Sequence, residues 1–174
     1  MLALMGINAN RETFRDEDKI RIHPIISNGG ELVNVVPSRV TVETYVRGAK
    51  KEAIERACRK VDAAVRGGAL AVGAQCEIND IPGYMPLSQD KRLTEIFEEN
   101  AKELVGEKYI HHGMDMTGST DMGDLSMKIP CIQPTMGGFS GTAHGTDFAV
   151  SDETAAYITP AKLLACTAYD ILKL

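Results

Sequence analysis

The segment RVTVETYVR, residues 39–47, alternates two kinds of side chain more clearly than any other part of the sequence. Valine or threonine fills the even positions from 40 to 46, and the odd positions carry Thr41, Glu43, Tyr45 and Arg47. Because successive side chains of a strand point to opposite faces, this pattern predicts a strand with one buried face. Any fold for this chain must therefore cover one side of that strand.

A second strand is predicted just before the first, in KIRIHPIIS at residues 19–27. This segment is apolar and rich in β-branched residues, and the Asn28-Gly29-Gly30 sequence after it is typical of a turn. Pro37 would end any strand ladder between the two segments. Asn34 lies in the same connection, where asparagine most often forms a turn.

From Lys50 the apolar spacing changes to that of an amphipathic helix, with charged residues on the opposite face. Gly67-Gly68 should weaken the end of this helix, and Gly73 should close it. The segment AQCEINDI, residues 74–81, predicts another strand. The apolar stripe of the helix consists of Ile54, Ala57, Cys58, Val61, Ala64 and Val65.

The first half of the chain therefore has the expected order α-β-β-α-β and belongs to the α/β (α+β) class. One strand placed before the first helix would complete a split β-α-β unit of the ferredoxin type. The opening LALMGINANRETF resembles the second half of a helix without an N-cap. We expect residues 1–84 to be a partial domain of a chain truncated at its N-terminus.

A second domain is expected at residues 85–174, after the turn-forming Pro82-Gly83 and Pro86. Ser88 is predicted to cap a helix that ends at Gly106. Residues 107–150 are rich in glycine, threonine and aspartate, which favours loops, with one short strand predicted at KIPCIQP, residues 128–134. Pro160 should lie in the first turn of a terminal helix.

Composition excludes several classes of function. The 174 residues carry a formal net charge of −5 and scattered basic residues, so we expect no nucleic-acid partner. No apolar run approaches the roughly 20 residues of a membrane span, and no signal peptide is visible. Four widely spaced cysteines without a C-x-x-C motif favour reduced thiols and a cytoplasmic protein.

His144, in GTAHGTDF, is the leading candidate ligand in the sequence. Small residues surround it, and Asp147 follows as a carboxylate that could orient an imidazole. A histidine in such a loop is about equally often a surface or helix-capping residue as a ligand. One histidine cannot make a zinc site, because zinc takes three or four protein ligands. The other ligands must come from elsewhere.

The segment HHGMDMTGSTDMGD offers further candidates but no tight metal-binding spacing. Its Gly118-to-Asp121 run could form an anion-binding nest or an ordinary turn. Glu98-Glu99 should be a solvated part of a helix, and His23 a packed or interface residue of a strand. Arg47 either faces solvent or clamps a carboxylate. The candidate metal ligands in this segment are His111, His112, Asp115, Asp121 and Asp124.

Two stretches together resemble a known family. GGELVNVVPSRVTVETYVR is similar to the lid domain of the di-zinc amidohydrolases and peptidases that include aminoacylase, carboxypeptidase G and aminobenzoyl-glutamate hydrolases. GSTDMGDLSMKIPCIQP followed by GTAHGTDF resembles the C-terminal part of that family's catalytic domain. The closest likeness is to the aminobenzoyl-glutamate branch. The resemblance implies a ferredoxin-like dimerisation (lid) domain that lacks its first strand, followed by the C-terminal α/β segment of a zinc-peptidase catalytic domain.

The resemblance also implies roles for individual residues. His144 matches the family's last metal ligand in a site of two zinc ions. Arg47 matches the lid arginine that holds the substrate carboxylate, and Gly118 and Ser119 match the loop around the same group. Asn34 matches the lid residue that reaches the scissile carbonyl across a homodimer. Asp121 belongs to the glycine motif, where we expect it to hold the loop.

Several family motifs are missing from the sequence, namely the H-x-D pair, the Glu-Glu pair with the general base, and the lid histidine. We therefore expect an isolated chain without activity, derived from an enzyme that hydrolyses an N-acyl amino acid or a small peptide-like amide with a free carboxylate. Two other hypotheses remain open. The chain could be a dimerisation module, or a small-molecule sensor that uses Arg47 as its carboxylate anchor.

Overall fold

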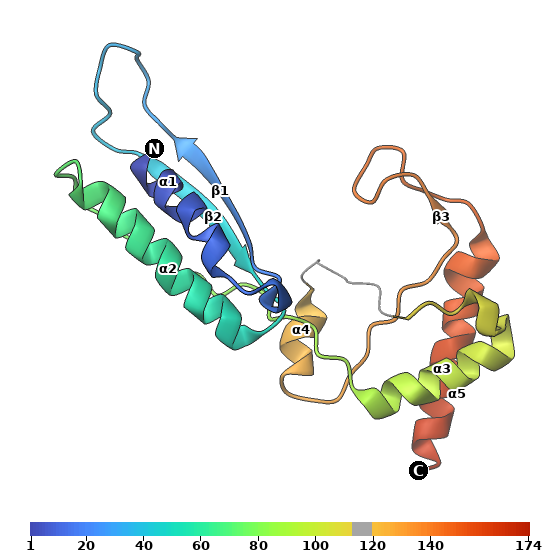
Figure 1. Ribbon diagram of the computed structural model, residues 1–174. Coiled ribbons are helices and arrows are strands. Elements are labelled where there is room, and N and C mark those ends of the chain that lie inside the picture. The colour runs from blue at the N-terminus through green and yellow to red at the C-terminus, as the bar shows by residue number, and fades with distance from the viewer. Residues whose placement is uncertain (113–119) are drawn as a thin grey trace. The chain divides into compact units, whose positions relative to one another are not determined.

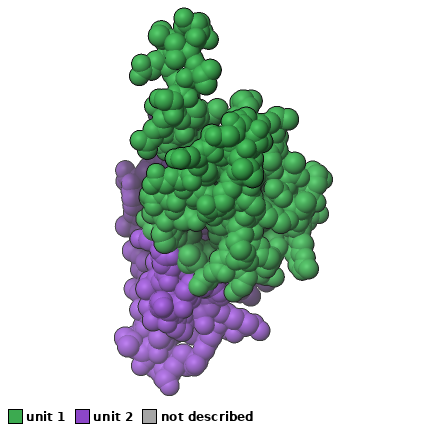
Figure 2. Space-filling view, turned by 90° about the vertical axis from the view of Figure 1, so that its left-hand side faces the viewer, with its two compact units in different colours: residues 1–86 green, residues 87–174 purple. Residues whose placement is uncertain are grey.

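The computed structural model describes residues 1–112 and 120–174. The chain divides into two compact units, residues 1–86 and 87–174, which are coloured separately in Figure 2. Each unit has its own elements and its own buried side chains, so the two are described one after the other.

The first unit is a two-stranded antiparallel hairpin covered on one face by two helices (Figure 1). Its elements are α1 (Leu2–Ala9), β1 (Arg21–Asn28), β2 (Thr41–Arg47) and α2 (Lys51–Leu70). Two short 3-10 turns, Arg11–Thr13 and Asp16–Asp18, lead from α1 into β1. The two strands and the helix predicted from periodicity are confirmed in this unit.

The core of the first unit joins one side chain from each layer. Ile7 of α1 and Ile22 of β1 are almost completely buried, and Val61 of α2 packs with them. Phe14 and Val46 pack against this cluster from the turn and from β2. Because Ile22 and Val46 are opposite each other in the ladder, they define the covered face of the hairpin.

The helix α2 continues through Gly67 and Gly68 and ends at Leu70. Gly68 lies against α1, and a Cβ added there would come within 2.5 Å of the backbone nitrogen of Ala3. A Cβ added at Gly67 would meet nothing within 4 Å. Gly68 is therefore where the two helices approach closely. Gly73 has a left-handed backbone (φ +69°) and its N–H donates to the Leu70 carbonyl, as a closing glycine should.

The strand predicted at residues 74–81 is wrong, since these residues are irregular. A strand needs a neighbour for its backbone N–H and C=O groups. In a β-α-β-β-α-β sheet the last strand pairs with the first, and the described residues contain no strand that pairs with residues 74–81. The mixed α/β class is confirmed, while the ferredoxin-like arrangement stays a prediction.

The second unit is built on two packed helices, α3 (Lys91–Val105) and α5 (Thr159–Leu172). A 3-10 turn follows α3 at Glu107–Tyr109, and a π-helical turn, Thr154–Ile158, leads into α5. Between them lie the short helix α4 (Asp121–Ser126) and a hairpin of two-residue strands, β3 (Phe139–Ser140) and β4 (Ala149–Val150). The terminal helix with Pro160 in its first turn is confirmed.

Two expectations for the second unit are wrong. The N-cap of α3 is Asp90, whose Oδ1 accepts the Leu93 N–H at 2.9 Å, whereas the Ser88 N–H donates to Ser126 Oγ. Residues 128–134 form no strand, because the carbonyl of buried Cys131 accepts the Asp90 N–H at 2.9 Å. That carbonyl is thus paired with the start of α3 instead of a strand ladder.

Candidate functional site

Asn34 lies in the connection between β1 and β2, residues 29–40, which extends away from the helices in Figure 1. Gly30 has φ +117°, and its N–H donates to Asn28 Oδ1 at the start of the connection. The apolar side chains on either side of Asn34 are exposed, with Val33 and Val36 nearly free of contacts. The connection therefore presents Asn34 within an uncovered apolar surface.

Arg47 ends β2 on the face of the hairpin that the helices do not cover. Its register partner is Arg21 of β1, and its Cζ lies 5.4 Å from the centroid of the Tyr45 ring. That distance is within the range of a cation–π contact. Among the described residues, neither arginine has a carboxylate partner within ion-pair distance. Arg47 is therefore available to an anionic ligand.

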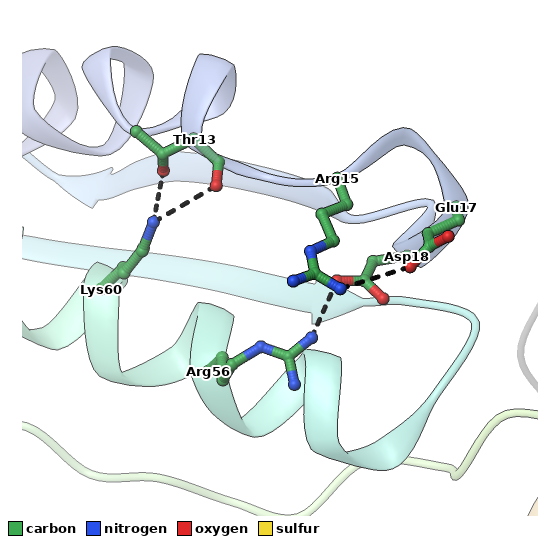
Figure 3. Close-up of polar contacts among 6 residues, drawn as sticks. All are labelled: Thr13, Arg15, Glu17, Asp18, Arg56 and Lys60. Carbon is green, nitrogen blue, oxygen red and sulfur yellow. Dashed lines mark hydrogen bonds and ion pairs between the residues drawn. The ribbon is translucent and has the colours of Figure 1, made fainter.

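The chain just after Arg47 is fixed by the buried residue Asp18. The Asp18 carbonyl accepts the Ala49 N–H at 2.8 Å, and its carboxylate accepts a hydrogen bond from Arg56 of α2, also at 2.8 Å. Figure 3 shows this pair beside the contact of Lys60 with Thr13. These contacts tie α2 to the turn before β1. They also hold the backbone just after β2 in a fixed position.

His144 lies in the β3–β4 connection with a left-handed backbone, φ +65°. This conformation costs free energy for a residue other than glycine, so the loop around it must be held in place. The Asp147 carboxylate does so by accepting the Thr142 N–H, and the Gly145 N–H donates to the Thr142 carbonyl at 2.7 Å. A Cβ at Gly141 would overlap the Asp147 backbone oxygen.

The base of the same hairpin is closed by two aromatic rings. Phe139 and Phe148 stack with their centroids 5.3 Å apart and their planes 10° from parallel. An offset stack of this kind adds about 0.5–1.5 kcal/mol beyond the area buried. The small residues of GTAHGTDF are therefore needed because the loop is too tightly folded for larger side chains. His144 lies in a turn that the Asp147 hydrogen bonds and the aromatic stack hold in place.

No set of three or more histidine, cysteine, aspartate or glutamate side chains forms a metal site within residues 1–112 and 120–174. His144 is thus a candidate ligand that belongs to no such group in the described part of the chain. His112 Nδ1 lies 3.0 Å from Glu98 Oε1, so Glu98 is half-buried and paired, not simply solvated, while Glu99 is exposed as expected. His111 and His23 are exposed. His23 is therefore not packed in a core, and its role as an interface residue stays a prediction.

The glycine motif is described only from Thr120 onward. Thr120 is the N-cap of α4, its Oγ1 accepts the Met122 N–H at 3.3 Å, and its hydroxyl lies 3.1 Å from Asp121 Oδ1. Asp124 is in the same first turn. The candidates Asp115, Gly118 and Ser119 lie outside the described residues.

An open groove of about 380 Å³ lies in the second unit, lined by residues 88–91 and 126–130. Asp90 already caps the helix at its edge, so one of the first N–H groups of α3 is satisfied there. None of the candidate metal ligands or substrate-binding residues lines this groove.

Comparison with known proteins places these features in a family. Residues 5–170 match the peptidase family M20/M25/M40, and the chain belongs to this family. It is therefore part of a hydrolase family whose peptidases are generally zinc-dependent.

The curated relatives include two mammalian proteins named Xaa-Arg dipeptidase. The human protein is 31% identical over 181 residues, covering 98% of this chain and 41% of the relative. The mouse protein is 30% identical over 162 residues, covering 87% of this chain and 37% of the relative. An uncharacterized hydrolase of Sinorhizobium fredii is 25% identical over 149 residues. The chain thus spans about two fifths of the length of the relatives it matches.

Among the described residues, no helix combines the length and the apolar character needed to cross a membrane.

Proposed function

We propose that this chain belongs to an enzyme that hydrolyses the amide bond of an N-acyl amino acid or small peptide-like substrate with a free carboxylate. The observation that carries the proposal is Arg47, which combines an uncovered strand end, a supporting Tyr45 ring and no carboxylate partner among the described residues. Family membership supplies the reaction class.

The chain's own residues would bind and orient the substrate. Arg47 would hold the substrate carboxylate through its planar fork of donors, which matches a carboxylate in two parallel hydrogen bonds. As the family resemblance implies, Asn34 would donate to the carbonyl of the scissile amide across a homodimer, and Gly118 and Ser119 would belong to a loop that binds the substrate carboxylate. Holding the carboxylate fixes the neighbouring amide, which lowers the entropic cost of the attack on it.

Two substrate types fit this proposal. The sequence resemblance favours an aminobenzoyl-glutamate-like amide, and two relatives are named Xaa-Arg dipeptidase. An aminobenzoyl-glutamate-like amide and an Xaa-Arg dipeptide each have an amide bond next to a residue that carries a free carboxylate. Arg47 would recognise this carboxylate. We propose this shared chemistry as the substrate class.

Zinc would supply an activated water and polarise the amide carbonyl when bound. A neutral imidazole such as that of His144 suits zinc, but a site needs three or four protein ligands, and the described residues contain no group of three or more that could hold a metal ion. The described residues therefore do not make a complete site. We propose His144 as a single ligand of the di-zinc site in the complete enzyme.

An isolated chain should then bind a carboxylate without cleaving the amide. The experiment incubates the 174-residue protein with zinc and N-acetyl-glutamate or an Ala-Arg dipeptide, and follows release of the free amino acid. We expect no release above a matched blank containing zinc alone. Sustained turnover that is lost in His144→Ala would overturn the proposed division of roles.

A second candidate function is homodimerisation through the lid. The observation that favours it is the exposed apolar surface of the β1–β2 connection, formed by Leu32, Val33, Val35 and Val36. Exposed apolar patches and uncovered strand edges favour association. Sedimentation would test this proposal, with a dimer expected for the wild type and a monomer for Val33→Asp/Val36→Asp. A wild-type monomer would contradict it.

The cytoplasmic location also stays a proposal. It is supported by Cys58, Cys76, Cys131 and Cys166, all of which are free thiols in the structure.

A further inference from the structure

Arg21 lies directly opposite Arg47 in the β1–β2 ladder. The next pair along the hairpin, Ile22 with Val46, points into the core, with Ile22 only 1% exposed. Since neighbouring pairs alternate between the two faces, the arginine pair lies on the face opposite the core. His23 and Tyr45 form the following pair on that same face.

Two arginines in this position repel each other. Directly opposed side chains of an antiparallel pair have Cβ atoms about 4.5–5.5 Å apart, and like charges there destabilise the strands. The register offers no compensating acid close by, because the carboxylate of this face, Glu43, belongs to the pair with Ile25, two same-face pairs further along. Neither guanidinium has an ion-pair partner among the described residues.

The backbone and side chains around the pair are held in place. The Arg47 guanidinium lies over the Tyr45 ring, and the Ile22 carbonyl next to Arg21 accepts a hydrogen bond from Arg11 Nη2 at 2.9 Å. The Ala49 N–H bond to Asp18 fixes the chain beyond Arg47. The contact of Arg47 with the ring and the supported backbone on both sides of the pair reduce the ordering entropy that is lost when an anion binds.

We propose that Arg21 and Arg47 together bind one substrate carboxylate, so that Arg21 is a second substrate-binding residue. This inference rests on the proposed role of Arg47 in the amidohydrolase. A carboxylate has two oxygens with about four acceptor positions, enough for a donor pair from each guanidinium. An anion between the two also removes their mutual repulsion, which adds to the free energy of binding. The ligand class is therefore an N-acyl amino acid with a free α-carboxylate.

The test is a titration of the 174-residue protein with N-acetylglycine, followed by NMR at the Nε–Hε groups of the arginines. N-acetylglycinamide, which lacks the charge, is the matched ligand. Arg21→Gln should weaken the binding of N-acetylglycine about tenfold, as expected when one charged hydrogen-bonding partner is lost. The control variant Arg59→Gln removes the same charge from an exposed position on α2 and should bind like the wild type.

The outcomes separate this inference from the proposed function. If Arg47→Gln weakens binding but Arg21→Gln does not, Arg21 is not part of the site and the clamp by Arg47 stands. If neither variant weakens binding, or if the amide binds as well as the acid, both the pair and the clamp are wrong. A loss of binding in Arg59→Gln equal to that in Arg21→Gln would show a general charge effect and would also overturn the pair.

A second readout uses the repulsion itself. Without ligand, Arg21→Gln should unfold at a higher temperature than the wild type, because the like-charged pair is gone. At saturating N-acetylglycine the wild type should show the larger rise in unfolding temperature. An unchanged or lower unfolding temperature of ligand-free Arg21→Gln would contradict the repulsive geometry on which the inference depends.

Discussion

Arg56 Nη2 lies 2.8 Å from the carboxylate of Asp18, which is only 6% exposed. The pair joins α2 to the turn that precedes β1, as Figure 3 shows. Because the Arg56 side chain is half-exposed, water screens part of the attraction, and the larger effect is the cost of leaving Asp18 buried without its partner.

Arg56→Leu should lower the free energy of unfolding by about 1–3 kcal/mol, since a buried carboxylate would lose a charged hydrogen bond. Urea unfolding measures this change. Arg59→Leu, at an exposed position of the same helix, is the control and should stay within about 0.5 kcal/mol of the wild type. Adding Asp18→Asn to Arg56→Leu should recover part of the loss. An equal loss of stability in Arg56→Leu and in the control Arg59→Leu would contradict the role of the Asp18–Arg56 pair.

The two glycines at the end of α2 should respond in opposite directions to alanine. Gly68→Ala should lower stability by about 1–3 kcal/mol, because its Cβ would collide with the Ala3 backbone of α1. Gly67→Ala meets no neighbouring atom and should raise stability by about 0.5–1 kcal/mol through helix propensity. Thermal unfolding of the two variants decides the point. A gain of stability in Gly68→Ala would contradict the close approach of α1 to Gly68, and a loss in Gly67→Ala would contradict the expected gain in helix propensity.

Thr167 offers a stabilising substitution. Its hydroxyl is buried in α5 and has no hydrogen-bond partner among the described residues. Thr167→Val keeps the branched shape and removes the unpaired polar atom, so stability should rise by about 1 kcal/mol. Chemical unfolding measures the gain, with Thr167→Ser as the control that keeps the hydroxyl and loses a methyl group. Destabilisation by valine would mean that the hydroxyl has a partner.

Cys58 should react slowly with alkylating reagents. Burial raises the pKa of its thiol, and the carboxylates of Asp80 and Asp62 raise it further. Because the thiolate is the reactive form, a raised pKa leaves less of it near neutral pH, and the labelling rate should rise only at higher pH than for an ordinary thiol. Mass spectrometry of iodoacetamide-treated protein across a pH series compares it with exposed Cys166. Asp80→Asn should shift the Cys58 profile to lower pH, and an unchanged profile would exclude that carboxylate as a cause.

The elements that were predicted correctly are those whose own residues show a periodic apolar pattern or a characteristic end residue. The alternation at 39–47 and the apolar stripe of α2 are local patterns, and so is Pro160 at the start of α5. The segments at 74–81 and 128–134 have the composition of strands but no partner, and pairing depends on chain that is distant in sequence. The N-cap was misplaced by two residues because Ser88 and Asp90 are both good caps, and contacts with residues 126–131 decide between them.

The candidate site was predicted from its motifs one residue at a time. Arg47, Asn34 and His144 are proposed because they resemble family positions. Arg21, our proposed second substrate-binding residue, was not predicted, because its position opposite Arg47 depends on the register of the hairpin, and the long connection of residues 29–40 does not specify a register. The alternation of β1 alone places Arg21 and His23 on one face, and this was the available signal.

We propose that Arg47 makes this chain a carboxylate-binding part of an amidohydrolase. The most direct measurement is the ratio of the dissociation constants of N-acetylglycinamide and N-acetylglycine for the wild type and for Arg47→Gln. We expect a clear preference for the acid in the wild type, and we expect this preference to fall about tenfold or more in the variant. An equal preference in both proteins would contradict it.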